Sequence, residues 1–230
     1  MKKKLVLFDI DGTLLKGESK VHLEAFDYAF QHAWKLHASI NEINHAGKTD
    51  RKCIFEVLEK HNIERSKIET NLIRTYRAMT YYFKKNSVLK GTYVVNPGIN
   101  ELLSKLANDR HVLGIVSGNL AEIGKLKLKI SGIKEFFNVY GFGGMSEDRP
   151  SLVKEAVRQA EEKFNQKFSN NDIFVIGDTP FDIMAGKVNK TKTIVVVAYR
   201  YTADELKKYN PDYIFQDFKN YNAVADIIES

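Results

Sequence analysis

The chain has 230 residues, 43% of them apolar and 28% charged, so it can fold as one domain, or as one domain with a smaller insert, and is not a disordered protein. No apolar stretch approaches the length of about eighteen residues that a membrane span needs, and the single cysteine, Cys53, excludes an intramolecular disulfide and fits a cytoplasmic protein. The net charge of +6 is spread over many separate lysines, which we interpret as a weak attraction for anionic substrates, with no nucleic-acid or membrane partner.

The first predicted element is a short strand at Leu5–Phe8, and two acidic residues follow it at once. Met1 and the three lysines that follow it do not predict a signal peptide, because an acid interrupts the apolar run after four residues. Since side chains alternate along a strand, Asp9 and Asp11 leave its end in the same direction and share one small volume, where they repel each other and need a cation. An isolated Asp-Gly pair would be a plain turn, whereas the string Asp-Ile-Asp-Gly-Thr predicts a phosphoryl-transfer site.

From residue 16 to about residue 90 the strand pattern disappears, and three amphipathic helical patterns follow one another. Their apolar residues recur at helical spacing: Phe26, Phe30 and Trp34; Ile54 and Leu58; and Ile68, Leu72, Tyr76, Met79 and Phe83. We interpret these stripes as the hydrophobic core of an all-helical insert and not as a cofactor site. Residues 96–100, rich in Asn, Gly and Pro, are typical of a return hinge.

Beyond the hinge, strand-like apolar runs alternate with helical patterns. Strands are predicted at 112–116, weakly near Val139, at 173–176, at 194–197 and at Tyr213–Phe215. Helices are predicted at 97–107, from Pro150 to about residue 163, and at 223–228. This alternation is typical of a parallel α/β sheet, in which ligands bind beyond the carboxyl ends of the strands.

Four segments in this order resemble the motifs of the haloacid dehalogenase (HAD) superfamily, and within it the Mg-dependent phosphatases related to phosphoglycolate phosphatase. The first is Phe-Asp-Ile-Asp-Gly-Thr-Leu at 8–14, and the second is the strand at 112–116 with the Ser-Gly-Asn that follows it. The third, Asp-Arg-Pro at 148–150, has Arg where the family usually has Lys. The fourth runs from 174 to 183 and contains Gly-Asp-Thr-Pro-Phe-Asp.

The resemblance implies an α/β fold, a Rossmann-like three-layer sandwich with a central parallel sheet, and a small all-helical cap domain of the C1 type inserted after the first strand. The core hydrolase domain would comprise residues 1–15 and 91–230, and the cap residues 16–90. The sequence leaves a monomer and a weak dimer both open.

The resemblance also implies a mechanism in which Asp9 is the nucleophile and forms an aspartyl-phosphate, while Asp11 protonates the leaving oxygen and later activates water. The expected cofactor is Mg²⁺, which prefers hard oxygen ligands. We expect it to be held by Asp9, by the backbone carbonyl of Asp11 and by Asp178.

Other site residues follow from the remaining motifs. Ser117, Gly118 and Asn119, at a strand-to-helix junction, would bind the phosphate, although Ser117 alone could be a plain N-cap. Asp182 would either cap a helix or support the metal ligands. For the basic group of the third motif we favour Arg149, whose planar fork suits phosphate oxygens, over Lys154 one helical turn further on.

Within the insert, Lys48 and Arg51 are candidate contacts for the part of the substrate remote from the phosphorus, while Thr49 or Asp50 would cap the helix that follows. The leading function is a phosphatase for a small phosphorylated metabolite. A phosphomutase resembling β-phosphoglucomutase has the same motifs and is the alternative. A catalytically silent binding module is less well supported, because all three essential acids are present, and the presence of Asp11 argues against a dehalogenase.

Overall fold

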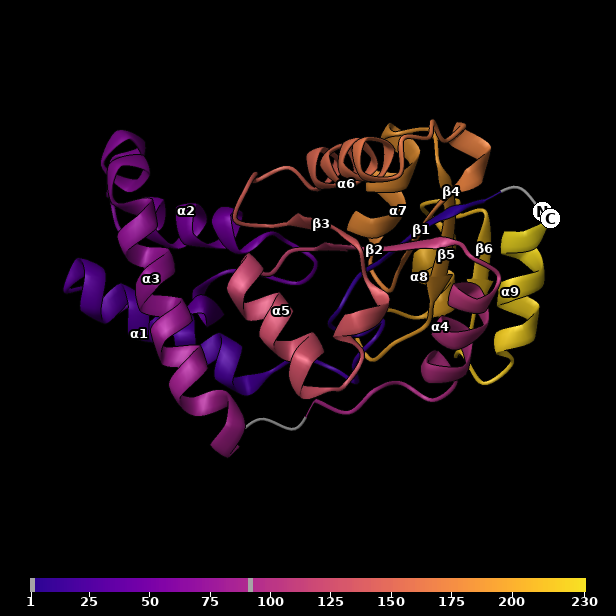
Figure 1. The fold of residues 1–230 in the computed structure, drawn as a ribbon. Helices are drawn as coiled ribbons and strands as arrows, with labels where there is room; N and C mark the ends of the chain where they lie inside the picture. Colours follow the sequence, from indigo (N-terminus) through magenta and orange to yellow (C-terminus); the bar gives the residue numbers. More distant parts are fainter. Residues whose placement is uncertain (1–2, 91–92) are drawn as a thin grey trace.

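The computed structural model describes residues 3–90 and 93–230. The predicted domain boundary, between residues 90 and 91, lies at the edge of the described part. The first two residues of the N-terminal run lie outside it. The strands of the described part form one parallel sheet of six, in the order β3-β2-β1-β4-β5-β6 (Figure 1). They are β1 (Leu5–Phe8), β2 (Val112–Ser117), β3 (Val139–Phe142), β4 (Ile173–Gly177), β5 (Lys192–Val196) and β6 (Tyr213–Phe215).

The central strand of this sheet is β1, and its register fixes where the acidic motif lies. Phe8, its last residue, is paired with Ile115 of β2 on one side and with Ile176 of β4 on the other. The carboxyl ends of these three strands therefore meet at one edge of the sheet, each followed directly by a motif residue. That edge is where the predicted site has to form.

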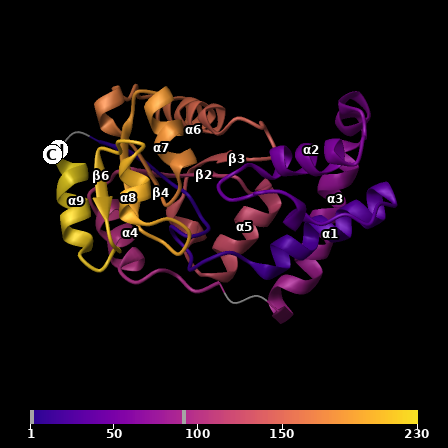
Figure 2. The ribbon, with the colours of Figure 1, turned by 180° about the vertical axis from the view of Figure 1, so that it is seen from behind.

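Helices cover both faces of the sheet because side chains alternate along each strand. Val6 and Phe8 pack toward α4 (Ile99–Asn108), α5 (Ala121–Ile130) and α9 (Tyr221–Glu229). Leu5 and Leu7 pack on the other face, toward α6 (Arg149–Phe164) and α7 (Pro180–Val188), with α8 (Ala203–Lys207) beside α7. Figures 1 and 2 show these two helical layers from opposite sides. Short 3-10 turns at Lys134–Phe136 and Asn170–Asp172 precede β3 and β4.

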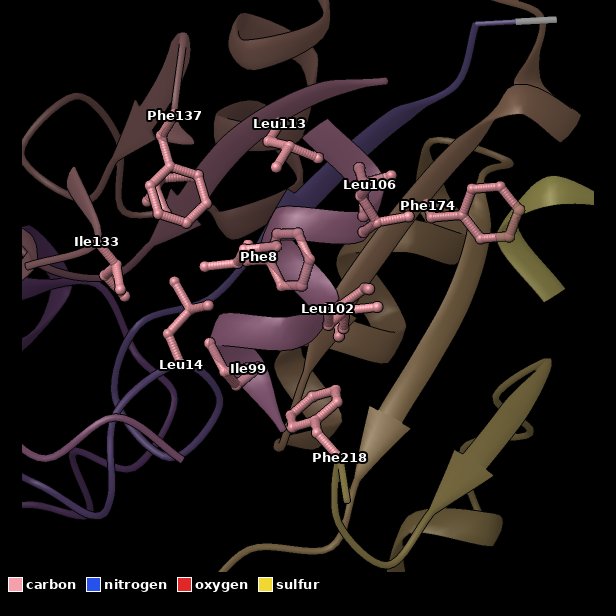
Figure 3. Close-up of a cluster of buried hydrophobic side chains, with 14 of the residues drawn as sticks. Phe8, Leu14, Ile99, Leu102, Leu106, Leu113, Ile133, Phe137, Phe174 and Phe218 are labelled. Carbon is pink, nitrogen blue, oxygen red and sulfur yellow. The ribbon is translucent and has the colours of Figure 1, made fainter. Parts of the chain in front are cut away.

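The larger hydrophobic core lies under α4. Figure 3 shows Ile99, Leu102 and Leu106 of this helix around Phe8, with Phe174 and Phe218 at the side. These side chains are almost completely buried. Truncating one of them, such as Leu102, to Ala would cost about 2–5 kcal/mol of stability by leaving a cavity. The core thus holds rigidly the strand that carries the two predicted catalytic acids.

The segment between β1 and the return hinge is all helical in its described part. It contains α1 (Lys20–Trp34), a 3-10 turn at Ile40–Glu42, α2 (Asp50–Lys60) and α3 (Arg65–Lys90), which lie together at one end of the sheet (Figure 1). We call α1, α2 and α3 with their connections the helical insert. Among the described residues, no helix combines the length and apolarity that crossing a bilayer requires.

The aromatic stripes form the core of the helical insert, as predicted. Phe26, Phe30, Met79 and Phe83 are buried in one cluster, which also takes in residues from the start of α5. Trp34 lies at the rim, where its indole Nε1 donates to Thr75 Oγ1 at 2.9 Å. The predicted fold class is confirmed: a parallel α/β sheet with an all-helical insertion after the first strand.

Local chemistry explains where several helices begin. Thr49 caps α2 by accepting a hydrogen bond from the amide of Lys52 at 3.2 Å, so Thr49 and not Asp50 is the N-cap. Asp148 caps α6, and Pro150 sits in its first turn, where a missing N–H costs nothing. The sequence places a strand-to-helix junction at residues 117–119, where α5 indeed follows, but it predicts no end for that helix, and α8 is not predicted at all.

Candidate active site

A pocket of about 70 Å³ lies between the carboxyl edge of the sheet and the helical insert. It brings together predicted residues from four separate motifs and from the insert. The predicted residues that line it are Asp9, Asp11, Lys48, Ser117, Gly118, Asn119, Arg149 and Asp178. Arg51, Asp182 and Lys154 are not among the lining residues. Asp9 and Asp178, 169 positions apart in the chain, thus share one small volume, as the topology requires.

The acidic motif is built into the end of β1. The amide of Asp9 donates to the carbonyl of Ile176 at 2.9 Å, which continues the strand pairing as far as Asp9. Gly12 has a φ of 88°, and a Cβ atom there would overlap the carboxylate of Asp178. Thr13 Oγ1 donates to Asp178 Oδ1 at 3.1 Å. The Gly-Thr of the motif therefore places and orients the acid of the fourth motif.

Three buried carboxylates, those of Asp9, Asp178 and Asp182, each offer an oxygen atom within 4.8 Å of the others. Burial raises the pKa of Asp9 to about 6, with Asp182 and Asp11 acting in the same direction and Arg149 opposing them. Burial also raises the pKa of Asp178, and the charge of Asp9 adds to this rise. A cluster of hard oxygen donors whose ionised form is this unfavourable fits a divalent cation such as Mg²⁺.

The basic partner of this cluster is Arg149, which is buried. Its Nη2 lies 2.8 Å from Asp9 Oδ1 and 2.6 Å from Asp182 Oδ1, and its Nη1 donates to the carbonyl of Gly47 in the insert at 3.0 Å. Lys154 is exposed on α6 and outside the pocket. Of the two rivals for the third motif, the structure brings only Arg149 to the acids.

The structure shows Asp182 as a helix cap, and places its carboxylate beside those of Asp9 and Asp178. Its Oδ2 accepts hydrogen bonds from the amide and the hydroxyl of Thr179, at 3.0 and 2.6 Å, which caps α7. Its Oδ1 pairs with Arg149. Asp182 is thus a helix cap that also fixes the guanidinium beside Asp9.

The phosphate-binding candidates lie at the end of β2. Ser117 Oγ accepts a hydrogen bond from Asn119 Nδ2 at 2.8 Å, and Leu120 is the N-cap of α5, so the interpretation of Ser117 as a plain N-cap is wrong. A Cβ atom at Gly118 would overlap the carbonyl of Lys48, and the amide of Asp50 donates to the carbonyl of Gly118 at 2.7 Å. The helical insert is therefore docked directly on this loop.

Sequence reasoning missed Lys127, which is fully buried in α5. Its Nζ lies 2.6 Å from Asp11 Oδ2, 2.8 Å from Asn119 Oδ1 and 3.2 Å from His22 Nδ1. Burial alone would raise the pKa of Asp11, but Lys127 and His22 outweigh it and lower that pKa. A signal was present: Lys127 lies four residues after Ile123, on the buried face of its helix.

Two groups of paired charges beside the pocket, one around Asp50 and one around Glu18, were also missed as site residues. His22 Nε2 lies 3.0 Å from Asp50 Oδ2, and the same oxygen accepts from the amide of Leu120 at 2.7 Å. At the mouth of the pocket, Glu18 lies between two bases: Arg200 Nη2 at 2.6 Å and His45 Nε2 at 3.1 Å. His22, His45 and Glu18 belong to no recognisable sequence motif.

The two predicted substrate contacts of the insert differ. Lys48 lines the pocket, and its Nζ pairs with Glu56 at 2.5 Å. Arg51 is paired with Glu69 of α3 at 2.5 Å and lies outside the pocket, so the structure does not bring it to the site.

The sequence of the chain matches the family model of the haloacid dehalogenase-like hydrolases over residues 6–196. The chain belongs to this family. The family resemblance read from the four motifs is confirmed, and the matched region includes the helical insert and the strands β1 to β5, except Leu5.

Relatives of this HAD-like hydrolase match it over nearly the full length. Pyrophosphatase PpaX of Oceanobacillus iheyensis is 25% identical over 221 residues, which is 96% of this chain and 95% of that protein. Among solved structures, a predicted phosphatase from Clostridium acetobutylicum has a TM-score of 0.68 at 21% identity, with 98% of this chain and 100% of that one covered. A β-phosphoglucomutase from Clostridium difficile has a TM-score of 0.71 at 15% identity, with 100% and 98% covered, so the two share the fold.

Proposed function

We propose that this HAD-like hydrolase is a Mg²⁺-dependent phosphatase that cleaves a small phosphorylated compound through an aspartyl-phosphate on Asp9. One observation carries the proposal: two carboxylates of one pocket, Asp9 and Asp11, are each paired with a separate buried cation. Arg149 pairs with the first at 2.8 Å, and Lys127 with the second at 2.6 Å. Two acids held apart in this way can take two different roles in one reaction.

In the first step, a carboxylate oxygen of Asp9 attacks the phosphorus, and the bond from phosphorus to the leaving oxygen breaks. Asp11 gives its proton to that oxygen; because Lys127 and His22 lower the pKa of Asp11 in the protein alone, the negative charge of the bound substrate has to raise that pKa first. In the second step, a water molecule attacks the phosphorus while Asp11 takes a proton from it, which releases phosphate, frees the carboxylate of Asp9 and returns Asp11 to its protonated form. Ser117 and the amides of Gly118 and Asn119 would bind the phosphoryl oxygens, together with Arg149.

The residues that would hold Mg²⁺ are Asp9, Asp178 and the backbone carbonyl of Asp11. Arg149, paired with both Asp9 and Asp182, would keep the Asp9 carboxylate in place. When bound, the ion neutralises the charge of the phosphoryl group and of the acids, so that an anionic nucleophile can approach. The buried cluster described above, whose carboxylates are costly to ionise alone, supports this assignment.

We further propose that residues 16–90 act as a cap over a core of residues 1–15 and 91–230, in the cytoplasm. Inorganic pyrophosphate is the first substrate to test, because relatives aligned over almost the whole chain are named pyrophosphatases. Lys48, which lines the pocket from the insert, would contact the leaving group. Phosphoglycolate and sugar phosphates are the next candidates.

Phosphate release from pyrophosphate, phosphoglycolate, a sugar phosphate and an aryl phosphate, with Mg²⁺ and with chelator, tests the proposal. Asp9→Asn should abolish turnover while thermal stability is retained, and Asp204→Asn, at an exposed site, should leave activity unchanged. Asp11→Asn should accumulate labelled phosphoenzyme from an activated donor. Label on a residue other than Asp9 would refute the mechanism, and isomerisation of a bisphosphosugar without release of phosphate would favour a mutase.

A further inference from the structure

Lys127 has no exposed surface and does not line the pocket, so it does not contact a substrate bound there. An ammonium group has three N–H donors, and here all three have acceptors: Asp11 Oδ2, Asn119 Oδ1 and His22 Nδ1, at 2.6, 2.8 and 3.2 Å. A charged group held on three sides is fixed in place. It fixes in turn the oxygen of Asp11 that it touches.

Asn119 holds the same oxygen from a second direction. Its Nδ2 donates to Asp11 Oδ2 at 2.8 Å, while its Oδ1 accepts from Lys127. Asp11 Oδ2 therefore has two fixed donors, and Asp11 is the more exposed of the two motif acids, with a side-chain exposure of 22% against 7% for Asp9. Among the described residues, these two donors are the groups that hold the Asp11 carboxylate in a fixed orientation in the pocket.

The contacts continue into the helical insert. Because Lys127 donates to His22 Nδ1, the proton of a neutral His22 lies on Nε2, which donates to Asp50 Oδ2 at 3.0 Å. We call Asp50, His22, Lys127, Asn119 and Asp11 the buried polar chain. It joins α1 and α2 of the insert to α5 and to the motif that follows β1.

We propose that Lys127 is a positioning residue for Asp11. His22 and Asp50 complete the hydrogen-bond network around Lys127 only when the helical insert is docked on the sheet. This rests on the proposed function, in which Asp11 protonates the leaving oxygen. The geometry would make proton donation depend on the insert, since His22 supplies one of the three acceptors of Lys127. Lys127 lies in none of the four sequence motifs.

The effect of Asp11 depends on the leaving group, which gives the proposal a specific readout. A weakly basic leaving group departs without a proton, whereas a strongly basic one needs the acid. We would measure kcat/KM for 2,4-dinitrophenyl, 4-nitrophenyl and phenyl phosphate with the wild type, Lys127→Met, Asp11→Asn and the double variant. Displacing a catalytic group by about 1 Å can cost about 10²-fold, so we expect a loss near 10²-fold on phenyl phosphate with Lys127→Met and a much smaller loss on the dinitro compound.

The double variant separates positioning from general damage. If Lys127 acts through Asp11, adding Lys127→Met to Asp11→Asn should lower kcat/KM little further. Equal losses over the whole leaving-group series, or losses that multiply in the double variant, would overturn the proposal. Lys129→Met, two residues away at an exposed position of α5, is the matched control and should behave as the wild type.

Two further variants protect the test from misfolding. Lys127→Arg keeps a cation and should restore part of the leaving-group profile. If Lys127→Met gives no cooperative melt, His22→Leu is measured in its place, because it removes one acceptor of Lys127. It should lower kcat/KM on phenyl phosphate more than on the dinitro compound, but less strongly than Lys127→Met. An unchanged leaving-group profile with His22→Leu would overturn the link to the insert. A wild type inactive on all three esters, by contrast, would refute the proposed function itself.

Discussion

The guanidinium of Arg149 lies 2.8 Å from the carboxylate of Asp9, and both side chains are buried. The same guanidinium is 2.6 Å from Asp182, whose other oxygen caps α7. Arg149 is thus held by a helix cap on one side and holds Asp9 on the other. The Arg in the third motif, where the family usually has Lys, reaches two carboxylates with one group.

Replacing Arg149 with Ala should lower kcat by about 10²-fold or more, because a cation aimed at the transferring phosphoryl group contributes most in the transition state. Lys154→Ala, on an exposed position of the same helix, should change kcat little. Steady-state kinetics on one substrate compare the two. A larger loss with Lys154→Ala would transfer the role to that residue.

The metal-free protein should become less stable as the pH rises from 5 to 7.5. The folded-state pKa of Asp9 is raised from 3.8 to about 6 and that of Asp178 is raised too, so their contribution is present at low pH and lost as the pH rises through about 6. For Asp9 alone the whole loss between pH 3.8 and 6 amounts to about 3 kcal/mol, of which roughly half falls above pH 5. Melting temperatures with chelator should fall over this range, and Mg²⁺ should raise them more at pH 7.5 than at pH 5.

Asp178→Asn is the control for this titration, because it removes one carboxylate of the cluster. Its melting temperature with chelator should depend less on pH, and Mg²⁺ should stabilise it less. Parallel curves for the variant and the wild type would contradict the assignment of the cluster.

Lys48→Ala should raise KM for an anionic substrate such as pyrophosphate by about tenfold, since a hydrogen bond to a charged group contributes about 1.5–3 kcal/mol. Arg51→Ala, three residues on and paired with Glu69 outside the pocket, should leave KM unchanged. Hydrolysis of a neutral-tailed aryl phosphate should respond to neither. Equal effects of the two variants on all substrates would indicate damage to the insert instead of a lost contact.

Acid should destabilise the protein through His111, whose Nδ1 accepts from the amide of Lys4 at 3.2 Å. Burial lowers the pKa of His111 below its usual 6.5, so its contribution to stability is present above pH 6.5 and is lost as the pH falls through the lowered value. His111→Asn keeps an acceptor and does not titrate. Urea midpoints of the wild type should therefore fall more between pH 7.5 and 5.5 than those of the variant.

The parts of the site that the sequence predicts are those in which neighbours in the chain are neighbours in space. Asp9 and Asp11 are two residues apart at the end of a strand, so alternation alone brings them together. Lys127 is 116 residues from Asp11, and only the packing of α5 against the sheet makes them partners. The same holds for His22 and Asp50, which are placed by the docking of the insert and follow no local rule.

The helical insert shares its apolar interior with the sheet domain, since Leu120 and Ile123 at the start of α5 belong to the same buried cluster as Phe26 and Phe83. Separated from the rest, residues 16–90 would lack these two partners and present their apolar surface to water. Insert and sheet should therefore melt in one cooperative transition, and a fragment limited to the insert should not reproduce it. The cooperative folding unit of this enzyme therefore includes both the helical insert and the sheet domain.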